Sequence, residues 1–117
     1  MRNNTGDKLR IAHILESIET LQLILKNTSF DTFYANIEKR LATERLLEII
    51  GEAISNISDE TLNKSSIKIE WRKIKAFRNF VAHEYFRVDA QLVYSIATNE
   101  IIDLKNAIES ISKINDD

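Results

Sequence analysis

Residues 11–25 read IAHILESIETLQLIL, and their apolar side chains recur with the period of an α-helix. The series advances in alternating steps of three and four, which places its members on one helical face. These residues are Ile11, Ile14, Ile18, Leu21 and Leu25. Asp7 is the expected N-cap, and the short polar side chains of residues 27–29 are expected to end the helix because they compete for backbone hydrogen bonds. The stretch predicts a long helix with one buried face.

A second helix is predicted to begin after Asp31, its expected cap, and to continue to Ile57. Its expected core positions are Tyr34, Ile37, Leu41, Leu46, Leu47, Ile50, Ile54 and Ile57. Gly51 lies inside this pattern, where glycine costs about 1 kcal/mol relative to alanine. Close approach of another helix would explain the glycine, and so would simple tolerance. The polar connector 58–66 is long enough for one short helical turn.

A third helix is predicted from Ile69 to Phe86, and a fourth after Asp89, which is a good N-cap. The fourth helix has its expected core positions at Leu92, Ile96, Ile101, Leu104, Ile108 and Ile111. The chain has no proline and two glycines, so signals for hairpin turns are sparse. The sequence therefore predicts an all-α, antiparallel bundle of four long helices with a short connector helix, in a single domain over residues 1–117.

Composition excludes several classes of site. There is no cysteine, so disulfides, thiolate metal sites and a cysteine nucleophile are impossible. The two histidines, His13 and His83, are far apart in sequence, so we expect no metal and no cofactor. The polar N-terminus does not resemble a signal peptide, and no run approaches the ~18 apolar residues of a membrane span. A cytoplasmic protein is expected.

The formal net charge of −2 argues against a dedicated, high-affinity nucleic-acid binder, but it allows a local basic cleft. Basic residues are concentrated between Lys68 and Arg87. The part from Lys68 to Lys75 would ordinarily be a solvated helix face. It is of greater interest here because it adjoins the segment that carries most of the chemistry.

That segment, residues 71–89, reads WRKIKAFRNFVAHEYFRVD. Arg78, Asn79, His83 and Tyr85 fall within eight positions. Five residues turn an ideal helix by about 140°, so Arg78 and His83 would not share one face. They could converge if the helix is distorted, if the helix end enters a cleft, or if two chains meet symmetrically.

These residue types suit RNA cleavage. The 2′-hydroxyl must lose a proton and the leaving 5′-oxygen must gain one, and a histidine can serve either transfer near neutral pH. The guanidinium of Arg78 suits the negative charge that develops on the phosphate oxygens. Asn79 could orient the phosphate or the histidine, and Tyr85 could bond the phosphate or stack on a base.

The string RNFVAHEY resembles the Arg-x(4–6)-His signature of the HEPN superfamily, and His83-Glu84-Tyr85 resembles the His-x-Tyr extension of its HepT-like toxin branch. ERLLEIIGEAISNIS, residues 44–58, looks like the second-helix segment of that branch, and IEWRKIKAFRN with HEYFRVD looks like its third-helix segment. The resemblance extends over nearly the whole chain. Two departures are Glu70, where the family often has proline, and Arg87, where it often has glycine.

The resemblance implies a homodimeric helical bundle that cleaves RNA without metal, at a cleft between the two chains. It implies Arg78 and His83 as catalytic residues, with Asn79 in support and tRNA as one candidate substrate. The expected partner is a minimal nucleotidyltransferase antitoxin that transfers AMP to Tyr85. The AMP would add bulk and negative charge in the RNA groove and silence the toxin.

Simpler interpretations stand beside these. Trp71, Phe77, Phe80 and Phe86 are expected in the core or a dimer contact rather than stacked on bases. Glu44, Glu48 and Glu52 are expected to pair in solvent with Arg40 and Arg45, although Glu52 could instead support the site beside Arg78 or His83. The alternative functions are a non-catalytic, nucleotide-binding or regulatory partner of a nucleotidyltransferase, and a plain dimeric bundle without a ligand.

Overall fold

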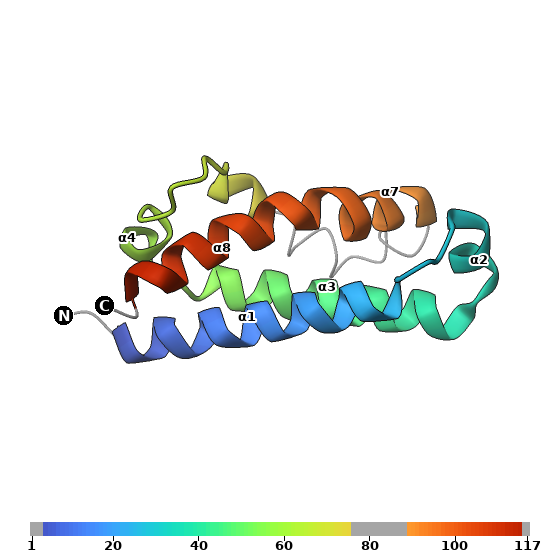
Figure 1. Ribbon diagram of the computed structural model, residues 1–117, viewed down its shortest axis with the longest axis horizontal. Coiled ribbons are helices and arrows are strands. Elements are labelled where there is room, and N and C mark those ends of the chain that lie inside the picture. Colours follow the sequence, from blue (N-terminus) through green and yellow to red (C-terminus); the bar gives the residue numbers. More distant parts are fainter. Residues whose placement is uncertain (1–3, 76–88, 116–117) are drawn as a thin grey trace.

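A computed structural model describes residues 4–75 and 89–115, and within these ranges the chain is helical with no β-strand. The all-α prediction is confirmed. Three long rods lie side by side along the long axis of the molecule (Figure 1): α1 (Asn4–Ile24), α3 (Ile37–Ser55) and the continuous series that ends in α8 (Ile101–Asn115). Of the predicted third helix, residues 71–75 are helical. Its continuation to Phe86 lies outside the described residues.

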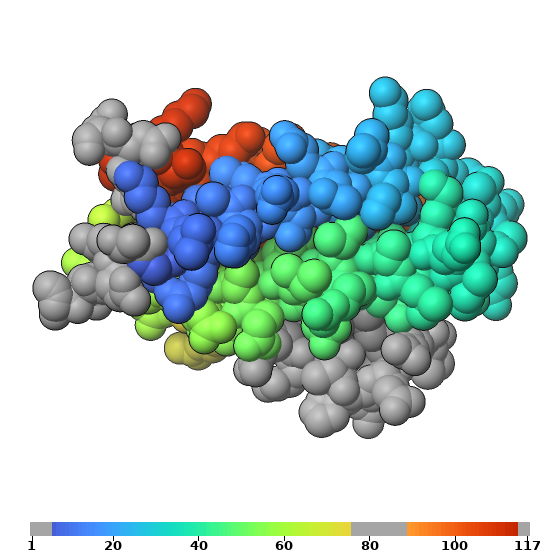
Figure 2. Space-filling model, turned by 90° about the horizontal axis from the view of Figure 1, so that it is seen from below, coloured from blue at the N-terminus to red at the C-terminus, as the bar shows by residue number. Residues whose placement is uncertain are grey.

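The core forms along the predicted face of α1. Ile14, Ile18 and Leu21 have no exposed surface, and Ile11 and Leu25 are also buried, as their spacing predicted. They pack against α3 and α8, and α1 and α3 run together along the face shown in Figure 2. Burial of each such side chain contributes about 1.5–3 kcal/mol, so this face holds the rods together.

The predicted N-cap role of Asp7 is wrong. α1 begins at Asn4, and Asp7 lies in its first turn with 4% of its surface exposed. Its carboxylate accepts hydrogen bonds from the hydroxyls of Ser58 at 2.9 Å and Thr61 at 2.7 Å. Thr61 lies in the short helix α4 (Asp59–Leu62), and Ser58 is the N-cap of that helix. The predicted connector helix is therefore confirmed. The carboxylate joins two elements instead of closing its own helix.

The second helix is broken in two, contrary to prediction. α2 (Phe30–Ala35) is capped by Ser29, and Asp31 lies in its first turn rather than at the cap. Asn36 then adopts an extended conformation, and its side chain accepts the amide hydrogen of Lys39 at 3.0 Å to cap α3. A short amide side chain favours such a local bond over continuation of the helix, which explains the break.

The break also changes which side chains are buried. Tyr34, Ile37 and Leu41 were predicted in the core, but 57%, 53% and 47% of their surfaces are exposed. Phe33 and Thr43 are buried instead. The break places Tyr34 on α2, apart from α3. Ile37 and Leu41 belong to α3 but lie off its buried face, which carries Thr43, Leu47, Ile50 and Ile54. The remaining predicted positions of α3, from Leu46 to Ile54, are buried or half-buried.

The last rod contains a π-helical turn that the sequence analysis did not predict. Asp89 caps α7 (Ala90–Ser95) by accepting the amide hydrogen of Leu92 at 2.9 Å, which confirms it as the N-cap. The π-helix η1 (Ile96–Glu100) follows, and the Ile101 amide donates to the carbonyl of Ile96, five residues back. The extra residue shifts the buried face, so the predicted core position Leu92 is 38% exposed and its neighbour Val93 is buried.

The ends of α1 and α7 are tied together at the α2 end of the bundle. The Tyr94 hydroxyl donates to the Thr28 carbonyl at 2.6 Å, and the Tyr94 ring packs against Phe30 and Phe33. Asn27 has φ 56°, a left-handed conformation that asparagine tolerates better than most residues. The predicted end of the first helix near residues 27–29 is confirmed, since α1 ends at Ile24.

Candidate functional site

The four residues of the predicted site, Arg78, Asn79, His83 and Tyr85, lie outside the described residues. Phe77, Phe80, Phe86 and Arg87 lie outside them as well. The structure therefore describes the elements that precede and follow residues 76–88 in the sequence. These elements are the helical residues 71–75 on one side and the capped start of α7 on the other.

The N-terminal flank begins where Glu70 precedes Trp71. The backbone amides of Lys73 and Ile74 both donate to the Glu70 carbonyl, so the helical turn begins there instead of at Ile69. Trp71 and Ile74 are half-buried and pack against the core cluster, which confirms the predicted packing role of Trp71. The turn is therefore anchored on the bundle a few residues before the predicted site.

Charged side chains of this flank form two exposed ion pairs. Lys73 Nζ lies 2.9 Å from a Glu70 oxygen, and Lys75 Nζ lies 3.0 Å from Asp59 Oδ1. The hydrogen bond from Lys73, aided by its charge, lowers the pKa of Glu70, and the same contact raises the pKa of Lys73. The second pair is the longer-range one, because it connects the turn to α4.

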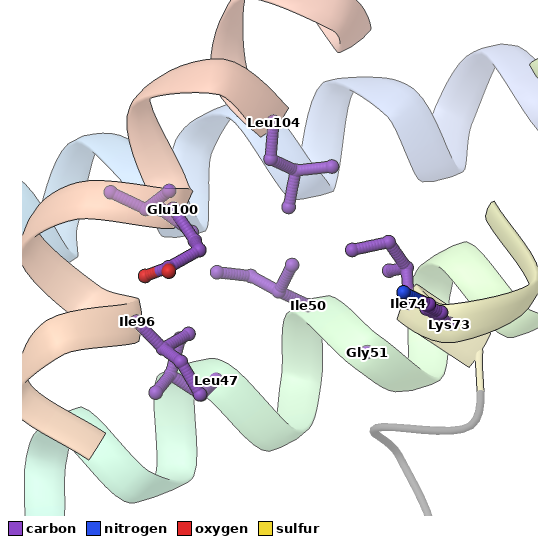
Figure 3. A pocket seen from close by; sticks show the side chains of 9 residues that line it. Leu47, Ile50, Gly51, Lys73, Ile74, Ile96, Glu100 and Leu104 are labelled. Atoms are coloured by element: carbon purple, nitrogen blue, oxygen red, sulfur yellow. The ribbon is translucent and has the colours of Figure 1, made fainter. Parts of the chain in front are cut away.

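A cavity of about 200 Å³ lies where this flank faces α3 and the last rod (Figure 3). Its walls are mainly apolar, and its charged contributors are Lys73 and Glu100. The other lining residues are Leu47, Ile50, Gly51, Ile74, Ile96, Ile101 and Leu104. Gly51 is buried at this wall, which favours close packing over simple tolerance as the reason for a glycine inside α3.

The π-helical turn supplies Ile96 and Glu100 to this cavity. Such turns are rare and are frequent at functional sites, because the inserted residue redirects side chains. Glu100 was not predicted to line a site, although the sequence contains a signal for the π-turn. The expected core positions step by five residues from Ile96 to Ile101, which an α-helix does not favour but a π-turn accommodates.

Glu52, the predicted supporting residue, is exposed on α3, and its backbone carbonyl accepts a hydrogen bond from the Asn56 side chain. Its support of Arg78 or His83 stays a prediction. The predicted solvent pairing is confirmed for Arg45, which contacts Glu48 at 3.0 Å. The Arg40 guanidinium lies over the Tyr34 ring, 5.4 Å from its centre, and its predicted pairing with a glutamate stays a prediction.

The described residues contain neither a candidate metal site nor a helix suited to cross a membrane. No group of three or more histidine, cysteine, aspartate or glutamate side chains in residues 4–75 and 89–115 could hold a metal ion. Over the same residues, no helix has the length and apolar character that a membrane crossing needs.

Comparison with known proteins agrees with the sequence motifs. The sequence model of the family described as "Ribonuclease HepT-like" matches residues 14–111. A protein of Caldanaerobacter subterraneus subsp. tengcongensis named "Putative RNase" is 35% identical over 101 residues, which are 86% of this chain and 89% of that protein. "Probable ribonuclease HepT" of Thermococcus cleftensis is 31% identical over 100 residues, covering 86% and 90% of the two chains.

A two-part relative is also similar. "Gamma-glutamylcyclotransferase and putative RNase" of Methanocaldococcus jannaschii is 35% identical over 104 residues, which are 89% of this chain but 46% of that protein. No solved structure matches the chain.

Proposed function

Because the chain belongs to the ribonuclease HepT-like family, we propose that it is an endoribonuclease that cleaves RNA without a metal ion. The family is one of ribonucleases, and RNA is the substrate that it implies. The observation that carries the proposal is the joint presence of the Arg78-x4-His83 motif and a family match that spans residues 14–111. We treat residues 1–117 as one domain built around this motif.

We assign the chemistry to two side chains. His83 exchanges the protons: one leaves the 2′-hydroxyl as its oxygen bonds to phosphorus, and one reaches the 5′-oxygen as its bond to phosphorus breaks. The products are then a 2′,3′-cyclic phosphate and a free 5′-hydroxyl. Arg78 binds the phosphate and stabilises the charge that develops on its oxygens, a role that suits a permanently charged, fork-shaped group. Asn79 and Glu52 support these two residues.

We further propose that two chains form a homodimer in which both motifs contribute to one cleft. The 140° separation of Arg78 and His83 on an ideal helix supports this, since a symmetric partner can supply the missing neighbour. A minimal nucleotidyltransferase antitoxin is the proposed regulator, through AMP transfer to Tyr85. The added phosphate would repel RNA from the cleft. The cytoplasm, where RNA and ATP are both present, is the proposed compartment.

The decisive test is cleavage of total tRNA, and of a mixed RNA pool, by the purified chain in excess EDTA. The protein is first checked by mass for an unmodified Tyr85. His83→Ala should abolish cleavage, and Arg78→Ala should reduce it by about 100-fold or more, as for loss of one group that stabilises transition-state charge. His13→Ala is the matched control, because His13 is the second histidine of the chain and is exposed on α1.

Cleavage that persists in EDTA, disappears with His83→Ala and is unchanged by His13→Ala would support a metal-independent site at His83. Equal cleavage by His83→Ala and His13→Ala would refute it and point to a contaminating nuclease. A folded, unmodified parent that cleaves no RNA but binds ATP or AMP would favour the regulatory partner of a nucleotidyltransferase instead.

A further inference from the structure

An open groove of about 690 Å³ lies between α4 and residues 69–75, outside the apolar cavity described above. One wall carries Arg72, Lys73 and Lys75, and the opposite side includes Asp59 and Asn63 of the α4 region. Trp71 forms part of the same lining. The groove thus combines three cations, an aromatic side chain and a neutral amide with two carboxylates, those of Glu70 and Asp59.

The three cations are not equally available. Lys73 and Lys75 are held by the carboxylates of Glu70 and Asp59. Within the part of the chain that the structure describes, the exposed Arg72 has no ion pair or hydrogen bond through its guanidinium. A guanidinium binds phosphate through two parallel hydrogen bonds, so Arg72 is the natural anion ligand of the groove.

The two lysine pairs do not block such binding. Exposed ion pairs are worth about 0–1 kcal/mol, so a phosphate can replace a carboxylate at little cost. Trp71 packs against the core while also lining the groove, which makes it a fixed platform. Single-stranded nucleic acids bind where cations follow the backbone and an aromatic ring meets a base or sugar.

The groove is also close to the proposed cleavage residues for reasons of chain length alone. Three peptide units separate Lys75 from Arg78, so their Cα atoms lie no more than about 11 Å apart. A strand bound along residues 71–75 is therefore within a few nucleotides of Arg78.

We propose that this groove binds the sugar–phosphate backbone of the RNA substrate beside the cleavage site, with Arg72 as the phosphate ligand and Trp71 as the contact to a base or sugar. The proposal rests on the ribonuclease function above and specifies where its substrate runs. RNA is favoured over an acidic protein segment because Trp71 lies beside the cations.

The test uses the full chain with His83→Ala, so that binding is measured without cleavage. The chain has a single tryptophan, so tryptophan fluorescence, excited where tyrosine does not absorb, reports on the surroundings of Trp71. Titration with a single-stranded RNA should quench Trp71 and give an affinity. Arg72→Glu should weaken that affinity about 10-fold or more at physiological salt, and Arg72→Ala should lower the salt dependence by about one released counterion.

Lys26→Glu is the matched control, because Lys26 is exposed just beyond the far end of α1 and the substitution changes the net charge equally. Its effect should stay below about 2-fold, since distant surface charges are screened. Three results would overturn the proposal. Both charge reversals could weaken the RNA affinity equally, or RNA could bind without quenching Trp71. Polyglutamate of matched charge could also compete for the groove as well as RNA does.

Cleavage by the chain with His83 intact separates the two proposals. Arg72→Glu should raise KM and leave kcat nearly unchanged, because it removes uniform binding. Normal cleavage with an unchanged KM would reject the groove and keep the ribonuclease. Arg72-dependent RNA binding without any cleavage would keep the groove and reject the nuclease.

Discussion

Removing the Asp7 carboxylate should destabilise the protein more than removal of any exposed acid in a comparable helical position. Asp7 is buried in the first turn of α1 and accepts hydrogen bonds from Thr61 at 2.7 Å and Ser58 at 2.9 Å. Arg10 lies 3.5 Å away as a weaker, same-helix partner. The carboxylate therefore links the start of α1 to α4, across more than fifty residues of sequence.

The magnitude follows from these contacts. Hydrogen bonds to a charged group are worth about 1.5–3 kcal/mol each. Asp7→Ala loses both and leaves two hydroxyls without their acceptor, so we expect a loss of about 3 kcal/mol in the free energy of unfolding. Asp7→Asn keeps one acceptor oxygen at similar size, and about 1–2 kcal/mol is expected.

The pH dependence of the free energy of unfolding tests the role of the Asp7 carboxylate independently. Burial by itself would raise the pKa of Asp7, but the hydrogen bonds from Thr61 and Ser58 and the charge of Arg10 outweigh it and lower the pKa. A carboxyl whose folded-state pKa is depressed stabilises the fold above its unfolded-state pKa. That contribution is lost as pH falls through the folded-state value. The stability gap between the parent and Asp7→Asn should therefore be largest near neutral pH and shrink in acid.

Urea unfolding followed by circular dichroism, repeated from about pH 7 to about pH 3, measures both quantities. Asp31→Asn is the matched control, because Asp31 also lies in the first turn of a helix but is exposed. It should change stability by no more than about 0.5 kcal/mol. A neutral-pH effect of Asp7→Asn as small as that of Asp31→Asn, or a gap that does not shrink in acid, would refute the account of a buried, ionised acceptor.

Three further changes test the packing of the bundle, each by urea unfolding. Leu21→Ala should cost about 2–5 kcal/mol because Leu21 is fully buried, whereas Leu23→Ala, on a side chain that is 72% exposed, should cost less than about 0.5 kcal/mol; similar losses would contradict the assigned face of α1. Tyr94→Phe should cost about 1 kcal/mol because it removes the donor to the Thr28 carbonyl, and an unchanged midpoint would mean that water replaces this bond. Asn36→Ala should cost about 1 kcal/mol through loss of the α3 cap, with Asn36→Asp as the variant that should retain it.

The spacing of apolar residues along the sequence correctly predicted most of the buried core. The α1 face and the buried positions from Ile101 to Ile111 followed from helical spacing, because a helix that covers a core repeats its apolar side chains every three or four residues. The errors have two physical origins. The π-turn at Ile96–Glu100 moved the buried face by about a residue, from Leu92 to Val93. Leu41 is apolar but lies off the buried face of the unbroken α3, because Thr43 takes the core position there.

Asp7 shows a different limit of prediction from the sequence. An acid before an apolar series has the same local signature whether it caps its own helix or accepts bonds from a distant one. Its partners Ser58 and Thr61 become visible only when α1 and α4 are placed together (Figure 1). Sequence motifs identified the proposed catalytic residues by type. The groove and the cavity depend on tertiary packing and could not be located from the motif.

For RNA binding, the positions of the individual charges matter more than the net charge of the chain. A net charge of −2 was an argument against strong RNA binding, yet at physiological salt a charge acts over only about 8 Å, so the sum over the chain does not determine the field at Arg72. The two carboxylates that line the groove, Glu70 and Asp59, are each paired with a lysine. Among the described residues, Arg72 is therefore the cation of the groove that has no ion pair. For that reason Arg72→Glu and Lys26→Glu, which are identical in net charge, should differ several-fold in RNA affinity.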